Sequence, residues 1–529
     1  MKSLFSNIKL FFWPDDKSLR LRRAELSLWA FVLALAYLPL PFGFLAWFAL
    51  VRPLAIISRL TPKEAFKAGY FYAFLASLFH LYWVAVVTPP GMVAAVFILS
   101  LYPAVVFSAF VKVYRFKRFL GLIALPFLWV GMEYFRSLTQ LAFPWTDLSY
   151  SQGYYLTIIQ IVSVIGCYGL SFALMMMNIF IWQVFSGANR LETRVSSGIA
   201  FLATFLVIYI YGWVVLPPYQ EKGDIRVAML QGNVDLATKW QSETRDRNFE
   251  LYDSLSNEVS GESVDLIVWP ETAAPCYPRL ERKYRRMLSR TVSGTGTTHL
   301  IGALDQVNRD GKEKAYNSAF QFSPDGDIEM VYHKVNLVPF SEHVPYQDYL
   351  PFLTREYLSK YLDIIRTRKV QWWSDFYPGD SIVVFETDKT RYSVLICFES
   401  AFPQFVRRCL LKGAEFMVNI TNDTWFGHSP GPFQHMRLAV FRAVENRTWM
   451  VRCANSGISS FIDPYGREIS GAGLFVRDVM TEDIYPIDEY STFTEAGPVF
   501  GQISLWIMTL VYVILIFLWV FGKIYKRRS

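Results

Sequence analysis

The sequence lacks the short motifs by which many metal and nucleotide sites are recognised. Its 529 residues include five cysteines and six histidines, with no C-x-x-C pair and no H-E-x-x-H motif. The glycine-rich stretch SGTGTT at 293–298 matches neither a Walker loop nor a dinucleotide fingerprint. We therefore expect no metal site and no cofactor. The odd number of cysteines also argues against a full disulfide framework and for at least one free thiol.

Charged residues are scarce, at 18%, whereas 53% of the chain is hydrophobic and 17% aromatic. Residues 26–216 are mostly apolar, residues 217–495 have the composition of a water-soluble α/β protein, and residues 503–520 are apolar again. Such a division indicates a polytopic α-helical membrane bundle that carries one large α/β domain.

The membrane spans can be counted, because a helix that crosses about 30 Å of hydrocarbon needs roughly 20 apolar residues. About eight segments qualify: 26–39, 41–58, 66–87, 92–111, 119–136, 157–185, 197–216 and 503–521. The first two share Pro39 and Pro41, so a single bent element, giving seven spans, is the alternative. We expect a bundle at 1–216, a large α/β domain at 217–500, and a final helix with a basic tail at 501–529.

The net charge of +7 does not indicate a nucleic-acid partner, because the basic residues flank apolar runs, as in KSLRLRR, KVYRFKR and KIYKRRS. The positive-inside rule places these segments, and both termini, in the cytoplasm. An odd seventh crossing then places residues 217–500 on the opposite side of the membrane.

The large domain alternates short strand patterns with helical ones. The strand patterns lie at 225–230, 264–269, 298–304, 317–322, 382–387, 392–397, 415–420, 450–455 and 458–463. The helical patterns lie at 239–258, 279–291 and 433–447. Strands therefore outnumber helices, which predicts a layered α/β domain with mixed sheets.

Three strand ends carry unusual polar residues. Glu271 follows the strand-like LIVW, Lys334 follows MVYH, and Cys397 closes SVLI. Each is ordinary by itself, because a cysteine that closes an apolar strand is more often core packing than a nucleophile. Sixty-three residues separate Glu271 from Lys334 and Lys334 from Cys397, so only the fold can bring the three together.

Taken together, these residues resemble the Glu–Lys–Cys triad of the nitrilase superfamily of carbon–nitrogen hydrolases. With the membrane bundle, the whole chain resembles the apolipoprotein N-acyltransferases. The resemblance rests on FPWTDLSYSQ (143–152), LQGNVDLATKW (230–240), VWPETAAP (268–275), HKVNLVPFSEHVP (333–345), ICFES (396–400) and NITNDTWFGHSPGPFQH (419–435). It implies a layered α-β-β-α sandwich for the large domain.

The resemblance also implies a ping-pong reaction through a thioester. Glu271 is the base for the Cys397 thiol, and Lys334 with the Phe398 N–H stabilises the oxyanion. Glu342 and Glu399 are the expected supporting carboxylates. The acyl donor is a membrane phospholipid, and the acceptor is the N-terminal amine of a diacylated apolipoprotein.

The expected substrate contacts are aromatic. Trp240 and Trp425 are candidate gates or acyl contacts, and Trp372 and Trp373 lie in an amphipathic insertion, 346–378, interpreted as a lid at the membrane interface. An ordinary surface insertion is the alternative. The residues Phe398, Ser341 and His428 depart from the family pattern, in which Tyr, Gly and Asp are common.

Three other functions remain open from the sequence alone. A membrane-tethered amidase would use water as the acceptor, and a divergent paralogue would use another acyl acceptor. A transporter or receptor would need ionisable residues inside the spans, where the sequence places only His80, Glu133 and Arg136.

Overall fold

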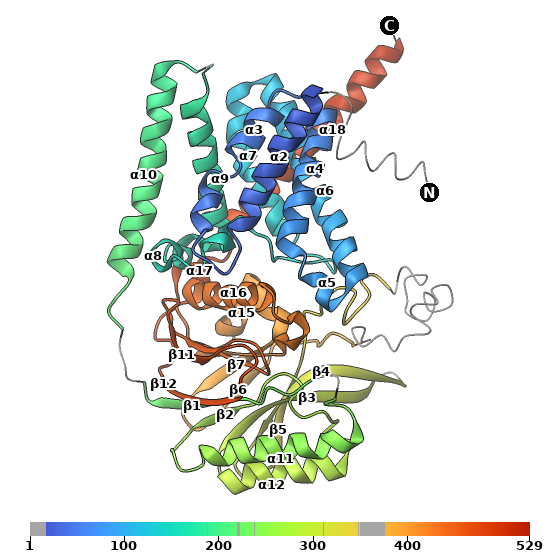
Figure 1. The fold of residues 1–529 in the computed structure, drawn as a ribbon, viewed down its shortest axis with the longest axis vertical. Helices are drawn as coiled ribbons and strands as arrows, with labels where there is room; N and C mark the ends of the chain where they lie inside the picture. Colours follow the sequence, from blue (N-terminus) through green and yellow to red (C-terminus); the bar gives the residue numbers. More distant parts are fainter. Residues whose placement is uncertain are drawn as a thin grey trace.

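The computed structural model describes most of the chain, namely residues 17–187, 189–219, 223–236, 238–309, 311–347, 349 and 376–528. Of residues 242 and 522–528 only the backbone is described. A bundle of helices forms one half of the molecule and an α/β domain forms the other, and α10 and α18 connect the two (Figure 1).

The bundle is built from apolar helices joined by short turns. Its elements are α2 (Lys17–Leu35), η1 (Gly43–Trp47), α3 (Val51–Ile57), α4 (Pro62–Leu81), α5 (Val84–Val87), α6 (Pro89–Phe116), α7 (Arg118–Phe135), η2 (Leu148–Gln152), α8 (Leu156–Ile159), α9 (Val162–Phe185), α10 (Leu191–Val215), α17 (Thr492–Ala496) and α18 (Val499–Arg528). Local capping sets some of the boundaries. Thr61 and Glu64 form a capping box before α4, and Thr88 caps α6 with Pro89 in its first turn.

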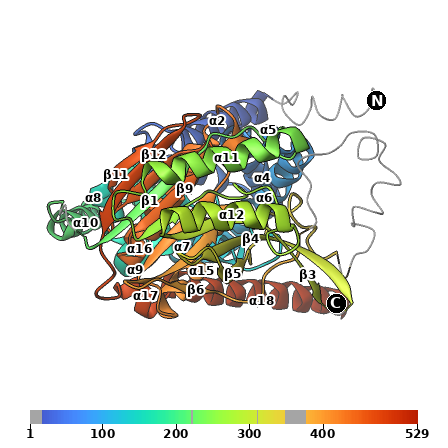
Figure 2. The same cartoon turned by 90° about the horizontal axis from the view of Figure 1, so that it is seen from below.

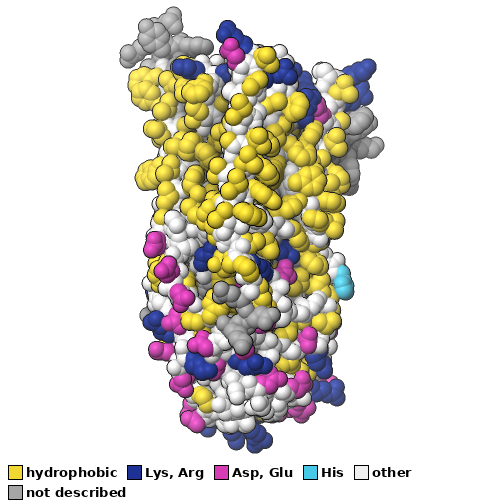
Figure 3. All heavy atoms as spheres, turned by 90° about the vertical axis from the view of Figure 1, so that its left-hand side faces the viewer, with side chains coloured by type: hydrophobic (Ala, Val, Ile, Leu, Met, Phe, Trp, Pro, Cys, Tyr) yellow, Lys and Arg dark blue, Asp and Glu magenta, His cyan; other side chains and the backbone are white. Residues whose placement is uncertain are grey.

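The prediction of about eight spans is not confirmed. Among the described residues, five helices are long and apolar enough to cross a membrane: Pro89–Phe116, Arg118–Phe135, Val162–Phe185, Leu191–Val215 and Val499–Phe521. The helices α2 and α4 also pack in the bundle, but their first turns carry several charged residues. The segment predicted as 41–58 is broken into η1 and α3. A belt of hydrophobic side chains covers the bundle surface (Figure 3).

The α/β domain contains two six-stranded sheets. The first has the order β12-β1-β2-β3-β4-β5, from β1 (Ile225–Gln231), β2 (Leu266–Val268), β3 (Thr298–Arg309), β4 (Lys312–Phe322), β5 (Ile328–His333) and β12 (Asp478–Ile484). The second has the order β11-β10-β9-β8-β7-β6, from β6 (Val384–Glu386), β7 (Arg391–Ile396), β8 (Phe416–Thr421), β9 (Met450–Ala454), β10 (Ser459–Ile462) and β11 (Glu468–Ala472). Both sheets are mixed, with parallel pairs at their centres.

The sheets stack between two helical layers, so the predicted α-β-β-α sandwich is confirmed. On the outer side lie α11 (Ser242–Glu258) and α12 (Arg282–Thr295), which cross the sheets side by side in Figure 2. On the side of the bundle lie α15 (Pro403–Leu411) and α16 (Gly431–Asn446). The nine predicted strand patterns and the three predicted helices are all present. Strand β5 was indicated only by MVYH before Lys334, and α15, β11 and β12 were not predicted.

Helix α16 fixes the domain to the bundle. Its Glu445 accepts a hydrogen bond from the backbone N–H of Cys167 (2.7 Å), which is accessible because Gly166 interrupts α9 with a φ of 66°. Its Gln434 accepts hydrogen bonds from the indole N–H groups of Trp83 (3.1 Å) and Trp145 (2.9 Å). The bundle and the domain therefore meet through buried polar contacts.

Candidate active site

Cys397 lies on a sharp turn between β7 and the short helix η4 (Cys397–Ala401). Its φ is +53°, in the left-handed region that residues with a side chain rarely adopt. Strain of this kind is concentrated at functional sites, where it presents a side chain in a fixed direction. The turn also places the Phe398 N–H in the first turn of η4, where backbone donors have no partner within the helix.

Glu271 and Lys334 come from the facing sheet and meet in a buried cluster with Glu342. Lys334 Nζ lies 2.8 Å from both carboxylate oxygens of Glu342 and 3.9 Å from Oε1 of Glu271. The amide of Asn317, on β4, donates to Glu271 Oε1 (2.7 Å) and more weakly to Glu342 Oε1 (3.4 Å). Glu271 is 7% exposed and Lys334 1%. Lys334 and Asn317 therefore hold two carboxylates side by side.

The charges of this cluster shift the pKa of each member. Burial raises the pKa of Glu271, although Lys334 counteracts the shift. Burial alone would lower the pKa of Lys334, but Glu342, Cys397 and Glu271 raise it overall. Burial, and then the negative charge of Glu271, raises the pKa of the Cys397 thiol. The thiol is therefore protonated at rest and needs a base.

Glu399 is fully buried and joins the turn at Cys397 to the segment that carries Lys334. Its Oε1 accepts hydrogen bonds from Tyr332 Oη (2.7 Å) and from the backbone N–H groups of Val335 (2.8 Å) and Asn336 (2.9 Å). Its Oε2 accepts one from the Ile396 N–H (2.8 Å). With both oxygens engaged in this way, Glu399 holds Lys334 and Cys397 in register.

A second buried series of hydrogen bonds holds the backbone at Cys397. His435 Nε2 lies 3.1 Å from the Cys397 carbonyl oxygen, and His435 Nδ1 lies 2.9 Å from Asp423 Oδ1. Arg452 donates to Asp423 Oδ2 (2.6 Å). Burial raises the pKa of Asp423, but Arg452 and His435 outweigh it and lower that pKa to about 2. A charged carboxylate and guanidinium therefore anchor the histidine that contacts the turn.

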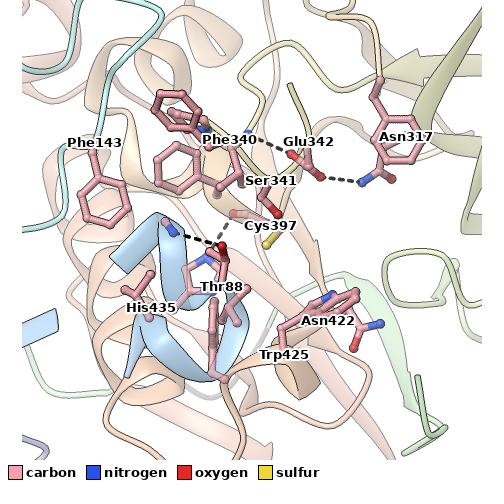
Figure 4. Close-up of a pocket in the computed structure, with 18 of the residues that line it drawn as sticks. Thr88, Phe143, Asn317, Phe340, Ser341, Glu342, Cys397, Asn422, Trp425 and His435 are labelled. Carbon is pink, nitrogen blue, oxygen red and sulfur yellow. Dashed lines mark hydrogen bonds between the residues drawn. The ribbon is translucent and has the colours of Figure 1, made fainter. Parts of the chain in front are cut away.

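These groups surround a cavity of about 720 Å³ at the junction of the domain and the bundle. Figure 4 shows Cys397 between Ser341 and Glu342 on one side and Thr88 and Trp425 on the other. One wall, the polar wall, consists of Glu271, Asn317, Glu342 and Cys397. The lining that the bundle contributes, the bundle wall, is mostly apolar apart from Thr88 and includes Val84, Val87, Ala95, Ile98, Leu99 and Phe143.

The loop that follows α7 completes the bundle wall, and a buried ion pair holds it. Arg136 donates to Asp147 Oδ1 (2.6 Å), with side-chain exposures of 4% and 0%. Glu133 accepts hydrogen bonds from the Trp129 indole (2.9 Å) and the Leu148 N–H (2.8 Å). Two of the three ionisable residues predicted in the spans, Glu133 and Arg136, thus anchor the loop that carries Phe143.

The structure brings most of the predicted site residues to this cavity. Trp240 and Trp425 line it, and Trp240 is 44% exposed. Phe398 also lines it and stacks on Phe143, with 5.8 Å between the ring centroids. Trp372 and Trp373, with most of the predicted lid, lie outside the described residues.

Of the two other residues that differ from the family pattern, one lies at the cavity and one lies away from it. Ser341 lines the cavity, next to Glu342. His428 packs on Phe475 with a centroid distance of 4.3 Å and does not belong to the lining. In the part of the chain that the structure describes, no group of three His, Cys, Asp or Glu side chains is placed to hold a metal ion.

Five supporting residues were not predicted: Asn317, Tyr332, Asp423, His435 and Arg452. Asp423 and His435 lie in the motif NITNDTWFGHSPGPFQH, which contributes to the family resemblance but did not by itself indicate a role for either residue. An aspartate and a histidine within one motif were the feature of the sequence that could have indicated these two supporting residues.

Comparisons with known proteins cover both halves of the chain. The family model described as "Carbon-nitrogen hydrolase" matches residues 226–490, and that described as "Apolipoprotein N-acyltransferase N-terminal domain" matches residues 29–180. A relative from Geobacter metallireducens, named "Apolipoprotein N-acyltransferase", is 35% identical over 474 residues, which are 86% of this chain and 88% of the relative. A relative of the same name from Chlorobaculum tepidum is 32% identical over 487 residues, which are 86% of this chain and 88% of the relative.

Among solved structures, an amidase of the nitrilase superfamily from Nesterenkonia AN1 is 17% identical to the matched region, with a TM-score of 0.39. It matches 54% of this chain and 97% of its own.

Proposed function

Because the chain belongs to the apolipoprotein N-acyltransferase family, we propose that it transfers an acyl chain from a membrane phospholipid to an apolipoprotein. The acyl group passes through a thioester on Cys397 to the N-terminal amine of the diacylglyceryl-cysteine. The observation that carries this proposal is the meeting of Glu271, Lys334 and Cys397 beside a cavity whose bundle wall is mostly apolar.

The first half-reaction forms the thioester. Glu271 takes the proton of the Cys397 thiol while the sulfur attacks the carbonyl carbon of a phospholipid ester. Lys334 and the Phe398 N–H stabilise the negative charge that develops on the carbonyl oxygen. When the C–O bond breaks, Glu271 returns the proton to the leaving oxygen, and a lysophospholipid departs.

The second half-reaction forms the amide. The uncharged amine of the lipoprotein attacks the thioester carbonyl carbon, and Glu271 accepts a proton from the nitrogen. The C–S bond then breaks, and Glu271 returns the proton to the Cys397 sulfur. Glu342 orients Lys334 throughout, because it holds Nζ at 2.8 Å, and Glu399 keeps the turn in register.

Competition with water is limited by the surroundings of Cys397. The bundle wall removes water from one side of the thioester, and the acyl chain fills the same space. Trp240 and Trp425, which line the cavity, contact the substrate there.

The enzyme lies in the bacterial inner membrane as a bundle (1–216), a periplasmic catalytic domain (217–500) and a final helix with a basic tail (501–529). Both termini are cytoplasmic. Lys and Arg side chains gather at the end of the bundle remote from the domain (Figure 3), which supports this orientation.

The test is a transfer assay with purified protein, a phospholipid and a synthetic diacylated lipopeptide with a free N-terminal amine. The expected product is the lipopeptide heavier by one acyl chain, with the chain on the α-nitrogen. The same peptide with an acetylated N-terminus is the matched control and gains nothing. Release of free fatty acid with an unmodified lipopeptide would instead indicate a hydrolase.

A further inference from the structure

A second buried lysine lies beside the proposed base and has no part in the mechanism above. Lys239 belongs to the turn between β1 and α11 and is 2% exposed. Its Nζ donates a hydrogen bond to Thr272 Oγ1 (2.6 Å), and Thr272 directly follows Glu271 in the chain. Trp240, the next residue, lines the cavity. Lys239 therefore contacts the backbone segment that presents the Glu271 carboxylate.

This segment is under local constraint. Thr272 has a φ of +49°, in the left-handed region, and the chain there runs against β3. A Cβ at Gly302 would lie 2.3 Å from the Pro270 carbonyl oxygen, so only glycine permits the approach. The Lys239–Thr272 hydrogen bond holds the strained residue from its other side.

The charges around Glu271 give Lys239 an electrostatic role. Glu271 faces Asn317 from β4, Lys334 and Glu342 from the segment after β5, Cys397 from the turn after β7, and Lys239. Lys334 lies closer to Glu342 (2.8 Å) than to Glu271 (3.9 Å). Two carboxylates, of Glu271 and Glu342, thus share one adjacent lysine, and Lys239 supplies the second positive charge.

The effect is mutual. Burial lowers the pKa of Lys239 to about 7, and the carboxylate of Glu271 counteracts that shift. The ammonium of Lys239 in turn lowers the pKa of Glu271, against the effect of burial. A neutral side chain at position 239 would leave a net negative cluster in a buried site and favour protonated Glu271.

We propose that Lys239 is a positioning residue for the acylation step. Its hydrogen bond to Thr272 and its buried positive charge hold Glu271 as an ionised carboxylate, directed at the Cys397 thiol. This inference rests on the proposed function, because it assumes that Glu271 is the base.

The test follows thioester formation on Cys397 in a single turnover between about pH 5 and pH 9. The probe is phosphatidylethanolamine with a fluorescent acyl chain in detergent micelles. For Lys239→Met we expect a rate about 10- to 100-fold lower near neutral pH. The acid limb of the pH profile should move to higher pH by about one unit, because loss of a nearby positive charge keeps Glu271 protonated over a wider range.

Three further variants make the result specific. Lys239→Arg keeps the charge and should retain the wild-type acid limb. Thr272→Val keeps the charge but removes the hydrogen bond, and we expect a loss of about 3- to 10-fold with a smaller shift of the limb. Lys283→Met removes a lysine whose side chain is 59% exposed and should leave the profile unchanged.

The outcomes separate this inference from the proposed function. A uniform loss at every pH in Lys239→Met, or a wild-type profile, would overturn the role of Lys239. If Lys239→Met does not fold, the other two variants decide. The proposed role of Lys239 would be overturned if the acid limb did not move in Thr272→Val, or if it moved in Lys239→Arg. Absence of any thioester in the wild-type protein would instead contradict the proposed function.

Discussion

The polar wall of the cavity holds its side chains through hydrogen bonds and ion pairs, whereas the bundle wall is formed by apolar side chains from α5, α6 and the loop after α7. Glu342, for example, accepts hydrogen bonds from Lys334 Nζ and from the Val338 N–H (2.9 Å). Ala95 and Ile98, by contrast, present only hydrocarbon to the cavity. We infer that the polar wall determines the chemical steps and the bundle wall determines which acyl chain is accepted.

The largest expected effect comes from the polar wall. Glu271→Gln keeps the shape of the side chain and a partner for Asn317 but removes the base for Cys397. The rate of thioester formation should fall by about 10²- to 10⁴-fold. Single-turnover labelling of Cys397 measures it, and Glu313→Gln, at an exposed position on β4, is the matched control. Near wild-type acylation in Glu271→Gln would show that the base lies elsewhere.

A change in the bundle wall should give a smaller and selective effect. Ala95→Phe adds a ring to a cavity of about 720 Å³. Acylation with long-chain phospholipids should slow by about tenfold while short-chain donors react normally, because the chain end loses space. Val105→Phe, also on α6 but 41% exposed on the bundle surface, is the control for helix stability. Equal losses for every chain length would contradict the division between the two walls.

The smallest effect is expected where the two walls meet. We propose the backbone N–H of Phe398 as an oxyanion donor, while its ring stacks on Phe143 and Trp145, at centroid distances of 5.8 and 6.2 Å. Phe398→Tyr should therefore change thioester formation by less than about threefold, since the oxyanion donor is unaltered. Separate measurement of acylation and of transfer to lipopeptide checks this. A large loss in acylation would mean that the ring sets the geometry of the N–H.

Much of the α/β domain was predictable from the sequence, because its central strands are short apolar runs bounded by turns. Strands β11 and β12 were missed, since both are partly exposed and carry polar residues such as Glu468 and Asp478. The span count exceeded what helix length and composition support. The reason is that α2 and α4 begin with charged residues, and Pro39 and Pro41 precede a broken segment.

For the site, the sequence predicted the residues that we propose to perform the chemistry but not those that hold them in place. Glu271, Lys334 and Cys397 were identified from their places at strand ends and from the family resemblance. Their supports, among them Asn317 and His435, act through contacts between residues distant in the chain, such as His435 with the Cys397 carbonyl. No local pattern indicates such contacts.

The most direct test of the central claim is mass spectrometry of the peptide that contains Cys397 after incubation of the protein with phospholipid alone. The account predicts a single acyl chain in thioester linkage on Cys397, released by a diacylated lipopeptide and absent in Cys397→Ala. Phospholipid-dependent acylation of another residue, or unchanged acyl transfer in Cys397→Ala, would contradict it.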